Sequence, residues 1–473
     1  MGELHTMTAL AMTAAVRRGE VSPVELVEHH LARIEAYAGL GAFVTVSAEQ
    51  ARSAAKAAEV AVTMGEPLPP LHGLPVAVKD LTATAGVRTT YGSVAFAEHV
   101  PDTDADLVTA LRAAGTISLG KTATSEYGTT LYTETEAWPP ARNPWRTDLS
   151  PGGSSGGAAV AVAAGLVPVA HGSDGGGSIR VPAALCGLVG YKPSRGLVPG
   201  SGGFGLATHG PIARTVADAA ALLDALAVPV PGEPFPAPAP PPGGSYSAAL
   251  RRPTGPLRIA RHTTPPLYDT PVHPDCRAAY ERASALLAGL GHEIVDVPAP
   301  YDPAMLADFR VLQCGLGGGR GTTKMARWLA DRARRYTAAE VLAAHARLTA
   351  AVRRAARALA GYDLVLTPTL ARPTVPIGHF AAMSPEEDFD QQTALSPYCS
   401  VHNLSGQPSV TLPVGTTPDG LPVGALLAAA PGADATLLAV AAAVEDPAGW
   451  KERHPAIWTK LPSATVKPDP RSL

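Results

Sequence analysis

The stretch SPGGSSGGAAVAVAAGLVPVAHGSDGGGSIRVPAALCGLVGYKPSRG, residues 150–196, carries the pattern from which the fold and the chemistry of this chain are predicted. Two glycine clusters that contain serines, residues 152–157 and 175–178, enclose an alanine-rich run. Glycine lets the backbone approach a ligand closely and point its N–H groups at it, and serine adds a hydroxyl group. Together the clusters indicate an acyl-transfer site with a nucleophile and an oxyanion hole.

Short helices and strands are predicted to alternate in and around this stretch. Residues 158–164 are expected to form an alanine-rich helix, and the apolar run 166–170 a strand. Upstream, LHGLPVAVKDL at 71–81 predicts a buried strand, residues 104–114 predict a helix, and TISLGKT at 116–122 predicts a second strand. This alternation is typical of an α/β sheet.

The flanking regions define the expected domain organisation. Residues 1–65 are predicted to form an outer helical layer, in which Ser22-Pro23-Val24-Glu25 matches a capping box with proline at the first helical position. Residues 66–462 are assigned to one catalytic domain. The proline-rich segment 229–244 is interpreted as a surface connection within it, although a domain boundary explains the segment nearly as well. Residues 463–473 are expected to be a loose tail.

The second half of the chain continues the alternation. LRIAR at 257–261 and HEIVDV at 292–297 predict strands, separated by a helix over about 273–290. A helical region at about 322–360 carries many arginines, which are interpreted as a solvated face rather than an anion site. Asp434 is predicted to cap a final helix.

Composition narrows the possible partners. The chain has 473 residues, of which 17% are charged, and a net charge of −3, which gives no electrostatic reason to expect a nucleic acid or a membrane as partner. Its four cysteines are dispersed, which favours reduced thiols in the cytosol over a disulfide framework or a zinc site. The N-terminus lacks a signal-peptide pattern, and no apolar run suits a membrane span. We therefore expect a cytoplasmic protein without a metal or cofactor.

Lys79 is a candidate general base at the end of the first predicted strand. It follows an apolar run that includes Leu74, Val76 and Val78. An ammonium group in such surroundings is desolvated, which lowers its pKa and makes the neutral amine available as a base. From this segment alone, a strand-end lysine that reaches solvent is the more common case. Lys121, which follows TISLG, has a similar setting and is the rival candidate.

Three serines are candidate nucleophiles. Ser154 and Ser155 lie in GGSSG, which also satisfies the G-x-S-x-G nucleophile-elbow pattern. An α/β-hydrolase would need acid and histidine partners later in the chain, and neither His379 nor His402 has a distinctive context. Ser178 follows three glycines whose N–H groups could surround a developing oxyanion. A phosphate-binding loop is the poorer interpretation, because the Gly-Lys-Ser/Thr ending of a P-loop is missing.

The whole block resembles the amidase signature family. That family's pattern is a G-G-S-S-G-G cluster, an alanine-rich helix, a D-x-G-G-S-I-R segment, then P-A and G-x-K-P. This sequence matches those parts at residues 152–157, 158–164, 174–180, 182–183 and 190–193. GLPVAVKD upstream and NLSGQPSVTLPVG downstream match further parts, so the resemblance extends from about Ser22 to Val444.

The resemblance implies an α/β fold in which a large twisted mixed β-sheet is covered by helices on both faces. It also implies a Ser–cis-Ser–Lys triad. In that triad Lys79 is the base, Ser154 is the bridging serine and Ser178 is the nucleophile that forms an acyl-enzyme.

The resemblance assigns supporting roles as well. Ser155 would support the proton network, and Asp174 and Arg180 would form a structural ion pair that braces the loop. The oxyanion hole would consist of the backbone N–H groups of Gly175, Gly176, Gly177 and Ser178.

Within the family, AHGSDGGGSIR and the preceding TETEAWPPARNPW look most like the branch of 6-aminohexanoate-cyclic-dimer hydrolases and related bacterial amidases. That branch implies hydrolysis of the C–N bond of a small carboxamide, secondary or cyclic. Tyr127, Gly128 and Cys314 lie where the family lines its pocket, but ordinary loop and core positions explain them equally well. An acyltransferase or amide synthase with an amine acceptor, an esterase, and a homodimeric state stay open.

Overall fold

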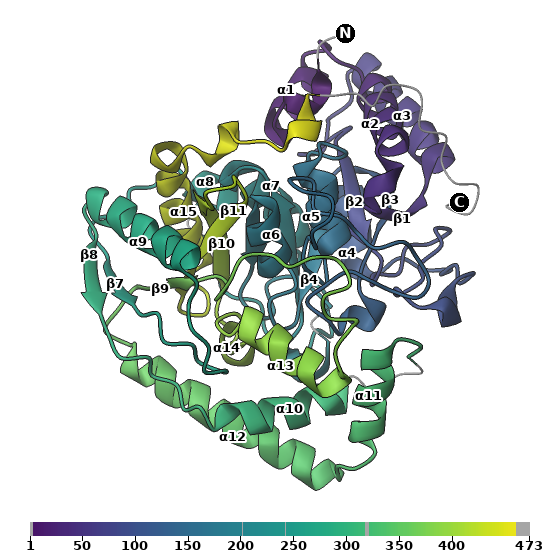
Figure 1. The fold of residues 1–473 in the computed structure, drawn as a ribbon. Coiled ribbons are helices and arrows are strands. Elements are labelled where there is room, and N and C mark those ends of the chain that lie inside the picture. Colours follow the sequence, from purple (N-terminus) through teal and green to yellow (C-terminus); the bar gives the residue numbers. More distant parts are fainter. Residues whose placement is uncertain (1–2, 201, 242, 317–320, 460–473) are drawn as a thin grey trace.

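An eleven-stranded sheet forms the centre of the computed structural model, which describes residues 3–200, 202–241, 243–316 and 321–459 (Figure 1). In the order in which they lie side by side, the strands are β1 (Phe43–Val46), β3 (Ile117–Thr122), β2 (Pro75–Lys79), β4 (Val169–Asp174), β6 (Thr208–Ala213), β5 (Val189–Lys192), β10 (Ser409–Thr416), β11 (Pro422–Ala429), β9 (Leu364–Pro368), β7 (Arg258–Arg261) and β8 (Glu293–Asp296). β2 is parallel to β3 and β4, and β7 is parallel to β8 and β9. The other pairs are antiparallel, so the sheet is mixed.

Helices surround the sheet. They are α1 (Ala9–Arg17), α2 (Pro23–Ala36), α3 (Ala48–Thr63), α4 (Asp106–Ala113), α5 (Gly156–Ala163), α6 (Arg180–Cys186), α7 (Val216–Leu226), α8 (Tyr246–Ala249), α9 (Pro274–Gly289), α10 (Met305–Leu316), α11 (Lys324–Ala333), α12 (Ala338–Ala358), α13 (Pro385–Leu395), α14 (Ser400–Ser405) and α15 (Asp434–Ala448). Most of the strands and helices predicted from the sequence are confirmed with boundaries shifted by a few residues.

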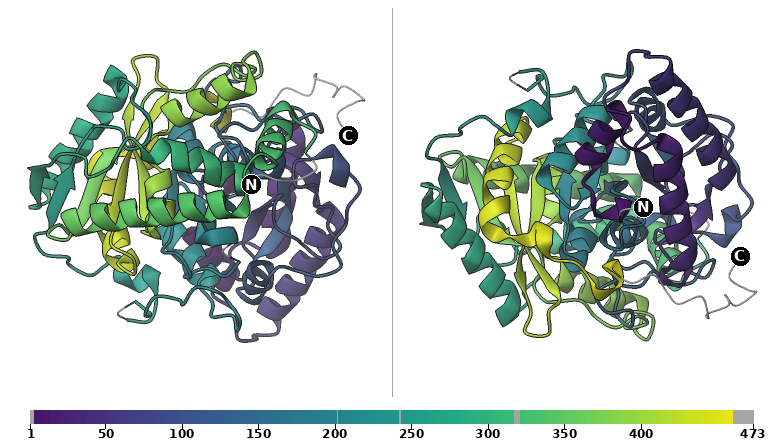
Figure 2. Two further views of the ribbon diagram at one scale, coloured as in Figure 1. Left: turned by 90° about the horizontal axis from the view of Figure 1, so that it is seen from below. Right: turned by 90° about the horizontal axis from the view of Figure 1, so that it is seen from above.

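Both faces of the sheet are covered. Successive residues of a strand point to opposite faces, and the core follows this rule at β2. Val76 and Val78 belong to one apolar cluster with residues of α7, α9 and α15, whereas Ala77 between them belongs to a second cluster with α5. Helices on both sides of the sheet are visible in Figures 1 and 2. The predicted α/β architecture is therefore confirmed.

The N-terminal layer begins as the sequence predicts but is not purely helical. α2 has a complete capping box, in which Ser22 Oγ accepts from the Glu25 N–H (3.0 Å) and a Glu25 carboxylate oxygen accepts from the Ser22 N–H (2.9 Å). Residues 43–46, however, form β1, the edge strand antiparallel to β3. Their sequence FVTV is rich in the β-branched and aromatic residues that favour strands.

Two further local predictions are wrong in their details. β4 spans Val169–Asp174 rather than residues 166–170, so it carries the start of the second glycine stretch to the edge of the site. Asp434 does not cap α15 but is its first residue. Its buried carboxylate accepts hydrogen bonds from the Tyr191 hydroxyl and the Ser194 N–H, both at 2.9 Å. A tertiary contact has therefore overridden the local helix-start signal.

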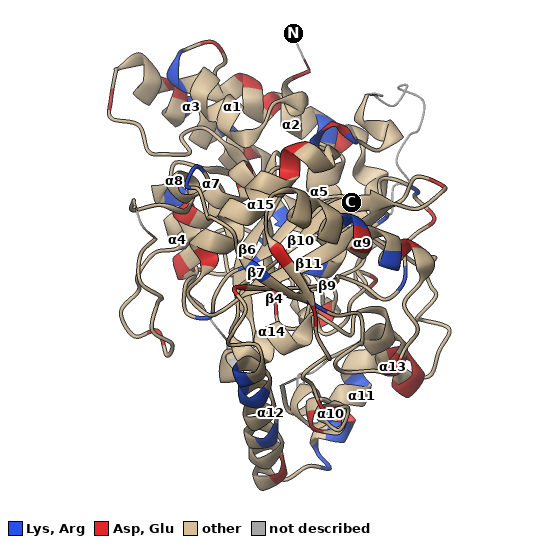
Figure 3. Cartoon of the chain, turned by 90° about the vertical axis from the view of Figure 1, so that its left-hand side faces the viewer, with Lys and Arg blue, Asp and Glu red and all other residues tan. Residues whose placement is uncertain are grey.

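The helices α10–α13 gather at one end of the molecule, opposite α1–α3 (Figure 1). Arg353, Arg354 and Arg357 of α12 are exposed, and Figure 3 shows basic residues along this helix at the molecular surface. The interpretation of these arginines as a solvated face is confirmed.

The segment 229–241 has no regular secondary structure and is largely exposed, whereas the tail 463–473 lies outside the described residues. All four cysteines are free and buried. Within the described ranges no helix combines the length and the apolar character needed to cross a membrane.

Candidate active site

Lys79 lies at the carboxyl end of β2, directly beside the first glycine cluster. Its Nζ is 2.7 Å from Ser154 Oγ and also donates to Ser173 Oγ (3.0 Å) and to the Ser173 carbonyl (3.2 Å). The side chain is 0% exposed, so it does not reach solvent as a strand-end lysine commonly does. Burial lowers the pKa of Lys79 to about 7, although the Asp174 carboxylate opposes the shift. At neutral pH a substantial fraction of Lys79 is therefore the free amine.

Lys121, the rival lysine, is bound elsewhere. It lies on β3, and its Nζ donates to the Thr82 carbonyl and to the hydroxyls of Thr84 and Thr89, the latter two at 3.0 Å. Burial lowers its pKa to about 8, against the opposing charge of Asp80. Because all its partners belong to the loop after β2, Lys121 stabilises that loop and makes no contact with the serines of either glycine cluster.

Ser155 joins the two glycine clusters. The peptide bond between Gly153 and Ser154 is cis. The next N–H, that of Ser155, donates to the Ser178 carbonyl at 3.1 Å, and Ser155 Oγ donates to the Ser173 carbonyl at 3.1 Å. The first cluster is thereby fixed against the end of β4 and against the loop that carries Ser178.

A buried ion pair holds the second glycine cluster. Arg180 donates to Asp174 from Nε to Oδ2 (2.9 Å) and from Nη2 to Oδ1 (2.8 Å), and both side chains are 0% exposed. Burial opposes ionisation of Asp174, but the charge and hydrogen bonds of Arg180 outweigh it, so the pKa of Asp174 lies well below its ordinary value. Arg180 is two residues from Ser178, so the pair forms a charged brace close to this serine.

The loop leaves three of the four predicted oxyanion donors available. The Gly177 N–H donates to Asp174 Oδ1 at 2.7 Å, so it belongs to the brace and does not fit the role that the resemblance implied. The N–H groups of Gly175, Gly176 and Ser178 have no acceptor among the described residues. A negatively charged oxygen is the kind of ligand to which such closely spaced backbone N–H groups donate hydrogen bonds.

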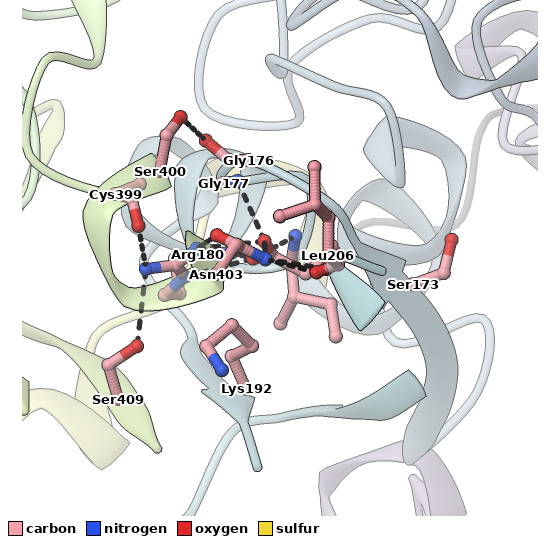
Figure 4. Close-up of polar contacts among 12 residues, drawn as sticks. Ser173, Gly176, Gly177, Arg180, Lys192, Leu206, Cys399, Ser400, Asn403 and Ser409 are labelled. Atoms are coloured by element: carbon pink, nitrogen blue, oxygen red, sulfur yellow. Dashed lines mark hydrogen bonds and ion pairs between the residues drawn. The ribbon is translucent and has the colours of Figure 1, made fainter. Parts of the chain in front are cut away.

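Asn403 of α14 completes the brace, and no local feature of the sequence predicts this role. Its Nδ2 donates to the carbonyls of Asp174 (2.8 Å) and Leu206 (3.0 Å), while its Oδ1 accepts from Arg180 Nη2 (2.6 Å). Arg180 Nη1 donates in addition to the Cys399 carbonyl at 2.8 Å (Figure 4). The segment NLSGQPSVTLPVG was noticed as part of the resemblance, but nothing local to it marks this asparagine as a partner of Arg180.

Gly128 borders the site, and its backbone conformation requires glycine. Its φ is +72°, and a Cβ atom at this position would lie 3.3 Å from Ser154 Oγ. The neighbouring Tyr127 also has a positive φ, +52°, and its hydroxyl donates to Ser93 Oγ at 3.2 Å. The structure thus places Gly128 next to the first glycine cluster, whereas the Tyr127 side chain contacts Ser93.

Cys314 lies in the core rather than at the site. It is 1% exposed and packs in an apolar cluster with Met325 and Leu329. Its neighbour Gln313 faces the second glycine cluster, because a Cβ atom at Gly176 would lie 4.0 Å from Gln313 Nε2. The structure favours the alternative that Cys314 is a buried core residue, and it adds Gln313 to the residues near the loop.

Comparison with known proteins agrees with this geometry. The amidase family model matches residues 25–316 and 319–438. The chain is 35% identical to the 6-aminohexanoate-cyclic-dimer hydrolase of Paenarthrobacter ureafaciens, covering 96% of this chain and 98% of that one. It is also 35% identical to an acylamidase of Rhodococcus erythropolis over the same shares of the two chains.

Solved structures give the same result. The structure of a 6-aminohexanoate cyclic dimer hydrolase in complex with its substrate superposes with a TM-score of 0.88 at 34% identity, covering 96% of this chain and 99% of that one. Since family model, sequence relatives and solved structures agree over nearly the whole chain, the protein belongs to the amidase family and is an enzyme, a hydrolase that acts on amide bonds.

Proposed function

We propose that this amidase cleaves the C–N bond of a small carboxamide through a covalent acyl-enzyme on Ser178, with Ser154 as proton relay and Lys79 as base. The observation that carries the proposal is the 2.7 Å contact between Ser154 Oγ and the amine of a completely buried lysine whose pKa is lowered to about 7. An amine in this state can take up a proton at neutral pH, and its hydrogen-bonded serine can pass one on.

Exposure is consistent with the proposed roles of the two serines. Ser178 retains 6% of its accessible surface, whereas Ser154 retains 1% and is hydrogen-bonded to Lys79. A nucleophile has to meet the substrate, while a relay has to be shielded from water. Ser154 Oγ and Ser178 Oγ share no hydrogen bond in this structure, and the mechanism requires that bond to form when substrate binds, as is common for catalytic hydrogen bonds.

The first step of acylation forms the bond between Ser178 Oγ and the amide carbon and moves two protons in a relay. Ser178 Oγ attacks the amide carbon while its proton passes to Ser154 Oγ, and the Ser154 proton passes to Lys79 Nζ. The carbonyl oxygen becomes an oxyanion that accepts hydrogen bonds from the N–H groups of Gly175, Gly176 and Ser178.

Collapse of this intermediate breaks the C–N bond. The proton held by Lys79 returns through Ser154 to the leaving nitrogen, which matters because an unprotonated amide anion is a poor leaving group. Water then attacks the acyl-Ser178 ester by the same proton path, which releases the acid and restores the free serine.

The substrate class is proposed from the relatives. Two of the relatives that match nearly the whole chain are a cyclic-dimer hydrolase and an acylamidase, and a cyclic-dimer hydrolase structure superposes over almost its full length. We therefore assign secondary amides, linear or cyclic, as the substrate class.

Labelling with a fluorophosphonate probe followed by peptide mapping tests the proposal. We expect a single adduct on Ser178 that is lost in S178A and strongly reduced in K79A. An adduct on Ser154, or undiminished labelling of K79A, would overturn the assignment of roles. Adding an amine during turnover of an anilide distinguishes hydrolysis from acyl transfer, since a transferase would form the new amide in preference to the acid.

A further inference from the structure

The pairing between β2 and β4 ends before Lys79, and a histidine ring of β4 takes the place of the next backbone hydrogen-bond partner. β2 and β4 are paired in parallel at Val76↔Val169 and Ala77↔Ala170, and this register ends there. On its other side β2 stays paired with β3 as far as Lys79. The main-chain N–H of Lys79 donates instead to Nδ1 of the His171 ring on β4, at 3.3 Å. A side chain has thus replaced the backbone partner of the base.

A second histidine holds the first. His171 Nε2 lies 2.9 Å from Nδ1 of His209 on β6, and the two rings are stacked with centroids 5.1 Å apart. An amide N–H can only donate, so His171 Nδ1 has to be unprotonated and its proton has to be on Nε2. That proton is donated to His209 Nδ1, which places the proton of His209 on Nε2. The Lys79 N–H therefore fixes the tautomer of both rings.

We propose that His171 and His209 are positioning residues for Lys79, which hold its main chain where β2 parts from β4 so that Nζ reaches Ser154. This inference rests on the proposed role of Lys79 as the base. Two consecutive hydrogen bonds, from the Lys79 N–H to His171 and from His171 to His209, give this N–H a held acceptor at the end of the strand. At this position Lys79 Nζ meets Ser154 Oγ and, on β4, Ser173 Oγ.

The surroundings keep the histidine pair neutral. His171 is 1% exposed and faces His209, Lys79 and Lys121. Burial, together with the charges of these neighbours, holds the pKa of His171 well below its ordinary value. Burial and the charge of Lys79 lower the pKa of His209 to about 4. The rings thus keep their acceptor atoms over the pH range in which Lys79 titrates.

Replacing each histidine with asparagine or with leucine tests the inference. An asparagine Oδ1 occupies about the position of Nδ1 and can still accept a hydrogen bond, whereas leucine cannot. We expect H171L to lower kcat by about 10- to 100-fold with little change in KM, because a small displacement of the base has that scale of effect. H171N should restore most of the rate. Equal loss in H171N and H171L would overturn the proposal, since packing alone would then explain both.

The double variant separates positioning from general stability. H209L should lower kcat in the natural background, because His171 Nε2–H then loses its acceptor. In H171N there is no Nε2 to hold, so adding H209L should cost little further. If the H209L loss is the same in both backgrounds, the two rings do not act through one another and the proposal fails. Thermal melts of all variants show that each is folded.

Nitrogen-15 spectra of histidine-labelled enzyme give a readout that does not depend on turnover. We expect His171 with an unprotonated Nδ1 and a protonated Nε2 at pH 7, in the natural protein and in K79A alike. A proton on His171 Nδ1 would overturn this inference even if K79A is inactive. Conversely, a fully active K79A with the expected spectrum would overturn the proposed base and leave the hydrogen-bond chain intact.

Discussion

If the proposed roles hold, we predict that the buried amine of Lys79 sets the pH at which Ser178 becomes reactive. Burial lowers its pKa from 10.5 to about 7, and this difference corresponds to roughly 5 kcal/mol against the charged form. Because only the neutral amine accepts a proton, the rate of acylation should rise with pH through about 7 and level off above it. At pH 5 the neutral fraction, and hence the rate, should be about 1% of its plateau value.

The assay is the second-order rate constant for inactivation by a fluorophosphonate probe, measured from about pH 5 to pH 9. This reaction reports on Ser178 without requiring the natural substrate. K79A should react slowly and without the step near pH 7. K192M is the matched control, because Lys192 is also buried with its pKa lowered to about 7, mainly by burial. Its Nζ donates to the Pro193 carbonyl rather than to a serine of the site.

Two results would refute this reasoning. A step near pH 8 that survives in K79A would assign the base to Lys121, whose pKa is lowered to about 8. If the rise of the inactivation rate near pH 7 is kept in K79A but disappears in K192M, the base is Lys192. Only loss of the step in K79A together with its retention in K192M supports the proposed base.

Three further predictions follow from the geometry around the site. R180M leaves the Asp174 carboxylate buried without its cationic partner. Chemical denaturation should therefore show that the free energy of unfolding falls by about 3–5 kcal/mol, and an unchanged unfolding transition would contradict a stabilising role of the ion pair. K79M should melt at a higher temperature than the natural protein at pH 7. The folded pKa of Lys79 is the lower one, so the unfolded chain binds more protons between about pH 7 and 10.5, and the natural protein gains stability as pH rises. The difference in melting temperature between K79M and the natural protein should therefore narrow toward pH 10. A constant difference would contradict a lowered pKa of Lys79 in the folded protein. G128A places a Cβ atom 3.3 Å from Ser154 Oγ at a φ of +72°, so we expect kcat to fall about tenfold and stability to fall by about 1 kcal/mol, checked by turnover and thermal melts.

Local features were predictable from the sequence where they depend on residues within a few positions. The start of α2 is one example, because Ser22, Pro23 and Glu25 form the capping box by themselves. The short helix after the first glycine cluster and the strand that ends at Lys79 are others. The two glycine clusters likewise indicated acyl transfer, since closely spaced N–H groups and hydroxyls are a property of the loops themselves.

Contacts between distant segments were not predictable in this way. Asp434 looked like a helix cap, but its carboxylate binds Tyr191 and Ser194 across the fold. Asn403 carried no local sign that it would bind Arg180. The Gly177 N–H was assigned to the oxyanion hole from its place in the motif, whereas the Asp174 carboxylate takes it. For Asp434 and Asn403 the deciding partner lies on a distant element, whereas Asp174 is only three residues from Gly177.

Lys79 and Lys121 show most clearly which properties follow from the local sequence and which depend on the tertiary structure. Local sequence shows that Lys79 and Lys121 both follow apolar strands. It does not distinguish a buried lysine with a lowered pKa from a strand-end lysine that reaches solvent, and only the family resemblance favours Lys79 as the base. The strand order β3-β2-β4 separates them. β2 lies next to β4 and so brings Lys79 within 2.7 Å of Ser154, whereas β3 is one strand farther away and turns Lys121 toward Thr84 and Thr89. Reactivity depends on which strands are neighbours, and long-range pairing in the sheet, not the residues flanking either lysine, decides that.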